Sequence, residues 1–109
     1  MEIVNATPHD LVIMDDAGNV VKTYATSDMV ARVSTQVASV SDIDGVPAVE
    51  TTFGAVTGIP DADGETVYIV SSLVRSASDR VDLVSPDTGP GSVVRDDSGR
   101  IVGVKRFTR

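Results

Sequence analysis

Valine is the residue that most constrains how this chain can fold. The 109 residues include 20 valines but only three leucines. Because β-branched side chains lose rotamer freedom in a helix and pack well on a pleated surface, this composition favours strands. A chain of this length can bury one hydrophobic core and is too short for two. We therefore expect a single, mainly β domain that spans residues 1–109.

Three turn sequences punctuate the expected strands. They are "DDAGN" at 15–19, "DIDGV" at 42–46 and "RDDSGR" at 95–100, and each separates two runs rich in apolar residues. The Asp-Gly pair within 42–46 is a strong signal for a two-residue hairpin turn. Gly, Pro and Asp mark residues 58–65 and 85–92 as exposed loops. Hairpins in series predict a small barrel or a strongly curved antiparallel sheet, because closure would remove the exposed edges.

One short helix is expected near residues 72–78. Residues 66–70 are apolar on both alternating faces, which indicates a central strand covered on both sides. Ser71 or Ser72 follows directly and can accept a hydrogen bond from a free backbone N–H at the start of a helix. Leu73, Val74 and Ala77 would then face the core.

The charge is strongly acidic and carried by aspartate. The formal net charge is −7, thirteen of the sixteen acidic residues are Asp, and only two of the nine basic residues are Lys. Such a surface stays hydrated where salt screens its charges, and it is typical of proteins from extreme halophiles and their viruses. An Asp-rich protein of a high-GC bacterium is the alternative. Net negative charge and only four aromatic residues argue against binding to nucleic acid.

Several chemistries are disfavoured by residues that the sequence lacks. It has no cysteine and a single histidine, His9, which argues against disulfides, thiol nucleophiles and transition-metal sites. No G-x-S-x-G or phosphate-binding-loop motif occurs, and "DADGE" at 61–65 lacks the spacing of a calcium loop. We therefore expect no enzyme activity, metal or cofactor. No apolar run could span a bilayer and no leader is evident, so the expected location is the cytoplasm of the host cell.

The segment "VNATPHD" at 4–10 contains the first candidate ligand residues. In an extended strand Asn5, Thr7 and His9 share one face, and Pro8 restricts the segment to a sheet edge or a bulge. Burying three polar side chains is costly unless each finds a partner. Either they form a polar network at the rim of the sheet, or they line a pocket for a ligand.

An anion site is a second possibility, built from hydroxyls, helix N–H groups and arginines. Arginine forks match phosphate and carboxylate oxygens, and an N-terminal helix turn offers unpaired N–H groups. Alternatively the arginines pair with nearby acids, Arg80 with Asp79 or Asp82 and Arg95 with Asp96 or Asp97. The candidate residues are Ser71, Ser72, Arg32, Arg75, Arg80 and Arg95.

Six segments form a pattern that covers nearly the whole chain. They are "NATPHDLVI" (5–13), "ARV" (31–33), "FGAVTGIP" (53–60), "YIVSSLV" (68–74), "DRVDLVSP" (79–86) and "VRDDSGRIVGV" (94–104). This pattern resembles a family of short proteins found in tailed viruses, prophages and high-GC bacteria, whose members begin with a similar Asn-x-Thr-Pro-His segment. The resemblance implies a virus-associated protein and assigns no biochemical activity.

Two functions from different classes remain. In the first, the chain is a non-enzymatic accessory module that holds a small polar or anionic, nucleotide-like ligand on the candidate residues above. In the second, it is a structural component of a virus particle, such as a capsid-decoration or tail-associated subunit of a halophilic tailed virus. The second function predicts self-association or binding to a coat protein, and a location in the virion. No membrane partner is expected for either.

Overall fold

The computed structural model describes all residues from 1 to 109 and is mainly β, as predicted. The single helix, α1, begins and ends within the stretch predicted from the sequence. No helix is long and apolar enough to cross a membrane. The elements are β1 (Glu2–Asn5), β2 (Leu11–Met14), β3 (Val20–Tyr24), β4 (Arg32–Ile43), β5 (Val46–Thr57), β6 (Thr66–Ile69), α1 (Ser72–Ala77), β7 (Leu83–Pro86), β8 (Val93–Arg95), β9 (Ile101–Val104) and β10 (Phe107–Thr108).

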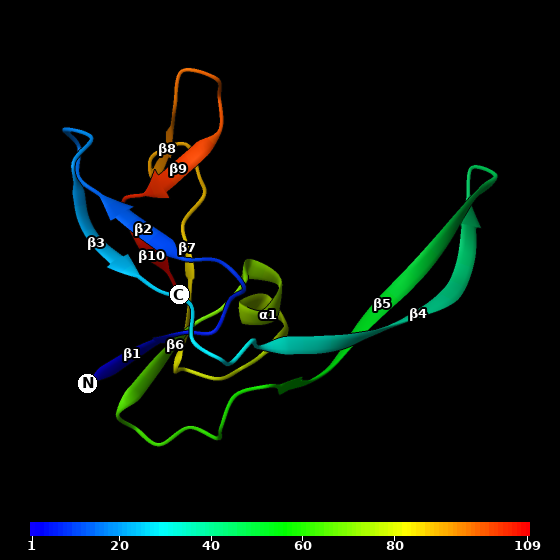
Figure 1. Cartoon of the computed structure of the whole chain (residues 1–109). Coiled ribbons are helices and arrows are strands. Elements are labelled where there is room, and N and C mark those ends of the chain that lie inside the picture. Colours follow the sequence, from blue (N-terminus) through cyan, green and yellow to red (C-terminus); the bar gives the residue numbers. More distant parts are fainter.

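The strands form three separate sheets, and no closed barrel is found. One sheet has the order β1-β6-β7-β10, a second has the order β3-β2-β9-β8, and β4 and β5 form the third by themselves (Figure 1). The predicted antiparallel pairing is found only in part, because β1–β6, β6–β7 and β2–β9 pair in parallel. Helix α1 lies between β6 and β7 in the chain. It forms part of the crossover connection that two parallel neighbouring strands require.

All three predicted hairpins are present: β2–β3, β4–β5 and β8–β9 are antiparallel pairs. The turn between β4 and β5 has two residues, Asp44 with φ 53° and Gly45 with φ 77°. Positive φ at both positions is the geometry of a type I′ turn, whose twist matches that of the flanking strands. The Asp-Gly signal in the sequence therefore identified this turn correctly.

The hydrophobic core is small and lies where β6, β7 and α1 meet. Its central side chains include Tyr68, Val70, Val74 and Leu83, all buried. The prediction that residues 66–70 form a central, covered strand is confirmed, since β6 lies between β1 and β7. Only 15 of the 109 residues are buried, which leaves many valines of this chain at the surface.

The β4–β5 hairpin projects from the rest of the chain as a long arm (Figure 1). We call residues 32–57 the arm and the remaining residues the body. The radius of gyration is 16.7 Å, whereas a compact domain of this length would have about 13 Å. At the base of the arm, Gly58 has φ 91°, and a Cβ there would overlap the carbonyl oxygen of Val30. Only glycine fits here, where two segments of the chain cross closely at the point at which the arm leaves the body.

Candidate functional site

Asn5 is buried and every polar atom of its side chain is used. Its exposed fraction is 2%, although it ends an edge strand. Nδ2 donates to the carbonyl oxygens of His9 and Tyr24, each at 2.9 Å. Oδ1 accepts from the backbone N–H of Thr7 at 3.0 Å and from its hydroxyl at 2.7 Å. The amide thus joins β1, the turn that follows it and the end of β3.

The extended row predicted for Asn5, Thr7 and His9 is wrong. Residues 7–9 bend away from β1, because the Asn5 side chain accepts from the N–H two residues later and closes a local turn. His9 is exposed, and its backbone carbonyl, rather than its ring, takes part in the network. The polar partners predicted for this segment are therefore supplied by the chain itself.

Two of the predicted anion-site residues do lie together. Arg32 and Ser71 line one shallow hollow of 240 Å³ between the base of the arm and α1. Ser71 also caps α1 as predicted, since its Oγ accepts from the N–H of Val74 at 3.2 Å. Ser72 is exposed beside it. None of the five hollows in the structure combines these residues with Asn5, Thr7 or His9.

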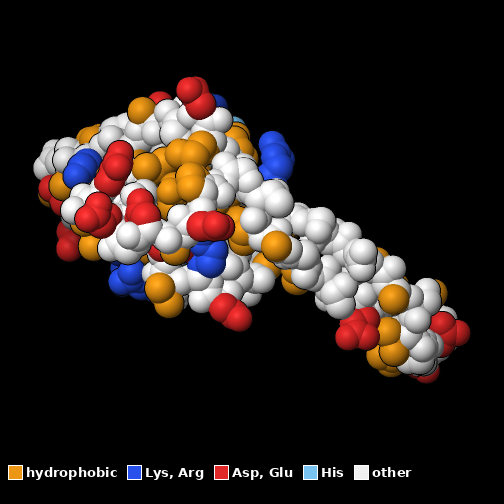
Figure 2. Space-filling view, turned by 90° about the horizontal axis from the view of Figure 1, so that it is seen from below, with side chains coloured by type: hydrophobic (Ala, Val, Ile, Leu, Met, Phe, Trp, Pro, Cys, Tyr) orange, Lys and Arg blue, Asp and Glu red, His pale blue; other side chains and the backbone are white.

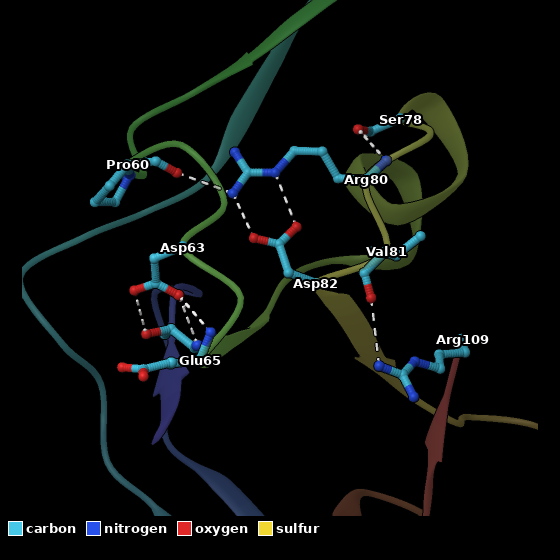
Figure 3. A network of polar contacts seen from close by, with 9 residues as sticks. Pro60, Asp63, Glu65, Ser78, Arg80, Val81, Asp82 and Arg109 are labelled. Carbon is cyan, nitrogen blue, oxygen red and sulfur yellow. Dashed lines mark hydrogen bonds and ion pairs between the residues drawn. The ribbon is translucent and has the colours of Figure 1, made fainter. Parts of the chain in front are cut away.

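Arg80 forms the ion pair that the sequence suggested with Asp82 (Figure 3). Its Nε donates to the carboxylate at 2.9 Å and one terminal nitrogen at 2.6 Å, while the same nitrogen also reaches the carbonyl of Pro60. These hydrogen bonds from Arg80 hold the pKa of Asp82 below its ordinary value. The pair ties the loop after β5 to the start of β7.

A groove of 710 Å³, the largest hollow of the molecule, lies beside this pair. We call it the arginine groove; its lining comes from α1, the segment after it and the end of the chain. The Nε of Arg75 donates to buried Ser85. Arg109 donates to the carbonyl of Val81 (Figure 3). Neither arginine has an acidic partner. The lining residues are Arg75, Ser76, Ser78, Arg80, Val81, Leu83 and Arg109.

Arg95 lies apart from these hollows, in the β8–β9 hairpin. It is exposed and donates to the carbonyl oxygen of Gly99 at 2.8 Å, so the predicted pairing with Asp96 or Asp97 is wrong. Asp96 instead accepts hydrogen bonds within its own turn, from Ser98 and the N–H of Arg100. The eight candidate residues are thus spread over several parts of the surface.

The arm carries a second candidate surface, which is apolar. On one face of the arm, Val37 lies diagonally across from both Val49 and Phe53, whereas Ile43 and Val46 pair at the tip on the opposite face. Such diagonal neighbours are close enough to form a continuous strip. With Val40 at a bulge, these six side chains are 42–67% exposed. Between residues 34 and 55 every residue is exposed except Ala48.

The arm is also nearly free of charge except towards its tip. Beyond Arg32 at its base, its only charged residues are Asp42, Asp44 and Glu50. Figure 2 shows the stem mostly in white, with acidic and hydrophobic side chains gathered at the far end. The surface of the arm is therefore suited to burying apolar area against another protein.

The sequence reasoning identified the hairpin but not that it stands alone. It assigned the hairpin to a closed or curved sheet, which would have covered its valines. The available signal was charge: residues 33–57 hold three of the chain's 25 charged residues, far fewer than the rest of the chain. A scan against family models and searches of curated proteins and solved structures found no match.

Replacing Asn5 with Ala should destabilise the body. The substitution leaves the carbonyl of Tyr24 and the N–H of Thr7 without this partner, whereas the carbonyl of His9 still accepts from the hydroxyl of Thr7. We expect a loss of about 2–3 kcal/mol. His9→Ala is the matched control, because its ring forms no hydrogen bond, and should change stability by less than about 0.5 kcal/mol. Urea unfolding followed by circular dichroism measures both. Equal stability of the two variants would contradict this role of Asn5.

Replacing Asp82 with Asn should lower stability in a pH-dependent way. Because folding lowers the pKa of Asp82, its ion pair contributes fully above the unfolded pKa of about 3.9 and is lost as the pH falls through the folded value. At pH 7 we expect a loss on the order of 2 kcal/mol, between the values of exposed and buried pairs.

The difference between native chain and Asp82→Asn should shrink when unfolding is measured near pH 3. Asp79→Asn serves as control, because Asp79 is exposed and forms no ion pair. A difference that stays constant between the two pH values would show that the pair does not act through the charge of Asp82.

Proposed function

We propose that this chain is a structural assembly subunit that binds neighbouring protein subunits, including copies of itself, through its arm. The observation that carries the proposal is the 26-residue hairpin that lies outside the core with apolar side chains exposed along it. Exposed apolar side chains on a projecting hairpin are suited to contact with another protein.

The energetics of an isolated hairpin support this. A two-stranded hairpin in water is marginally stable unless a third strand or another layer packs on it. The structure provides no such layer beyond the base of the arm, where Val33 and Val56 pack against the core. A neighbouring subunit that covers the apolar strip would supply the missing layer.

The amount of exposed surface points the same way. The chain exposes 7264 Å², whereas a compact monomer of 11.4 kDa would expose about 5,800 Å². The excess of about 1,500 Å² is close to the total area that a standard protein–protein interface buries. This excess area supports the proposal of a subunit that buries part of its surface against a neighbour.

A virus particle is the proposed setting of this assembly. The resemblance of segments such as "NATPHDLVI" to short proteins of tailed viruses supports it, and the acidic, lysine-poor composition supports a halophilic virus. Within a particle the subunit would serve as a capsid-decoration or tail-associated component, with particle and coat protein as its partners. Its location would then be the virion.

The alternative, a module for a small anionic ligand, has less support. Asn5 and Thr7 use their polar atoms on one another and on backbone groups, which removes the row of free groups on which that hypothesis depended. The shallow hollow between Arg32 and Ser71 is the observation that still favours it. Nucleotide binding by the native chain that is lost in Arg32→Ala would support this alternative.

Shortening the arm should abolish assembly without damaging the body. Replacing residues 34–55 with an Asn-Gly turn joins Val33 to Val56, which already pair across the hairpin, and Asn-Gly is the preferred sequence for this kind of turn. We expect the variant to unfold at the same temperature as the native chain within a few degrees. In sedimentation velocity it should stay monomeric where the native chain associates.

The matched control keeps the arm and makes the body less apolar. Val20→Thr combined with Val21→Thr removes two exposed valines from β3 and should leave association unchanged. Assembly of the shortened variant to the same extent as the native chain would contradict the proposal, as would a native chain that remains monomeric at every concentration.

A further inference from the structure

We propose that the tip of the arm of one copy docks into the arginine groove of a neighbouring copy. The inference rests on the proposed function, because it names the surface that receives the arm. It concerns two patches of opposite charge on the same chain, the groove and the tip of the arm. The groove is lined in part by α1, and α1 lies far from the turn that joins β4 to β5 (Figure 1).

The groove offers cationic groups that the chain leaves without acidic partners. Arg80 is neutralised by Asp82, but Arg75 and Arg109 each spend one nitrogen on a neutral oxygen, of Ser85 and Val81 respectively. Their remaining guanidinium nitrogens form no hydrogen bond or ion pair within the chain. Figure 3 shows the Arg109 guanidinium directed towards Val81, on the opposite side of Asp82 from Pro60. An acidic segment placed in the groove would therefore meet arginines that have no acidic partner.

The tip of the arm offers the complementary groups. Asp42 and Asp44 flank Ile43 and, unlike Asp16, Asp82, Asp87 and Asp96, form no ion pair within the chain. Ile43 and Val46 are paired across the hairpin and both are exposed. The far end of the arm therefore presents two carboxylates around an apolar pair (Figure 2).

The groove has an apolar part that matches this pair. Val81 is 82% exposed and supplies this apolar surface, because Leu83, the other hydrophobic residue of the lining, is buried in the core. Docking would thus bury apolar side chains of both copies and bring carboxylates to arginine forks. Since the chain has a net charge of −7, two copies repel each other where salt does not screen their charges, and a contact between oppositely charged patches offsets this repulsion.

The geometry makes this contact intermolecular. Each arm strand has twelve residues and spans about 40 Å, so the tip lies far from α1 of its own chain (Figure 1). A tip from one copy in the groove of the next is a heterologous, head-to-tail contact. Repetition of such a contact gives a ring if the rotation closes and an open array if it does not.

Charge reversal on each side, alone and combined, tests the contact. Asp42→Arg changes a strand residue of the tip, and Arg109→Glu changes an exposed residue of the groove. Each single variant should weaken self-association of the full chain about tenfold or more, because like charges then face each other. The double variant, Asp42→Arg with Arg109→Glu, should restore most of the loss. Sedimentation equilibrium in about 0.2 M salt, where charges in contact still interact, measures all three.

Asp97→Arg is the matched control, since it changes the net charge as Asp42→Arg does but lies in the β8–β9 turn and forms no ion pair. It should associate like the native chain. Circular dichroism confirms that each variant is folded. Single variants that associate normally, while the arm-shortened variant is monomeric, would overturn this docking and leave the arm's role intact.

Two other outcomes also overturn the inference. If both single variants weaken association and the double variant does not recover, tip and groove do not contact each other. If the native chain binds inorganic phosphate, Arg109→Glu abolishes that binding and association is unaffected, the groove is a small-anion site. If every variant still associates, including the arm-shortened one, the proposed function itself is contradicted.

Discussion

The buried amide of Asn5 is the contact on which the arrangement of the body depends. It joins the end of β1 to the following turn and to the end of β3. The adjacent Ala6 donates to Ile69 of β6 and accepts from Ala31, the residue just before the arm. Because a buried amide left without partners is costly, these segments can meet in essentially one way. The direction in which the arm leaves the body follows from this junction and from Gly58.

The arm and the body illustrate opposite solutions to the same problem, which is how to cover valine-rich strands. In the body, α1 and the β1-β6-β7-β10 sheet bury Val70, Val74 and Leu83 against one another. In the arm nothing covers Val37, Val49 or Phe53. A chain with few buried residues gains little from its own core, so covering this strip by a neighbour adds burial that the monomer lacks.

Local signals in the sequence predicted the elements, whereas their arrangement depended on contacts that no local signal contains. Asp44-Gly45 determines its turn through backbone preference alone, and Ser71 determines the start of α1 in the same way. The parallel pairing of β2 with β9 joins residues about ninety positions apart and leaves no trace in periodicity. Asn5 was identified as one of three polar side chains that need partners, but its partners Tyr24 and His9 depend on the fold. The isolation of the arm was missed because β-branched strands look alike whether covered or exposed.

The central claim is that the arm is completed by a neighbouring subunit. Hydrogen–deuterium exchange of residues 34–55, measured below and above the concentration at which the native chain associates, tests it most directly. A marginal hairpin opens often and exchanges fast, and a covered one does not. The account predicts that the amides bridging β4 and β5 become about tenfold or more better protected on association, while those of β6 in the core change little. Association that leaves the arm amides as fast as in the free chain would contradict it.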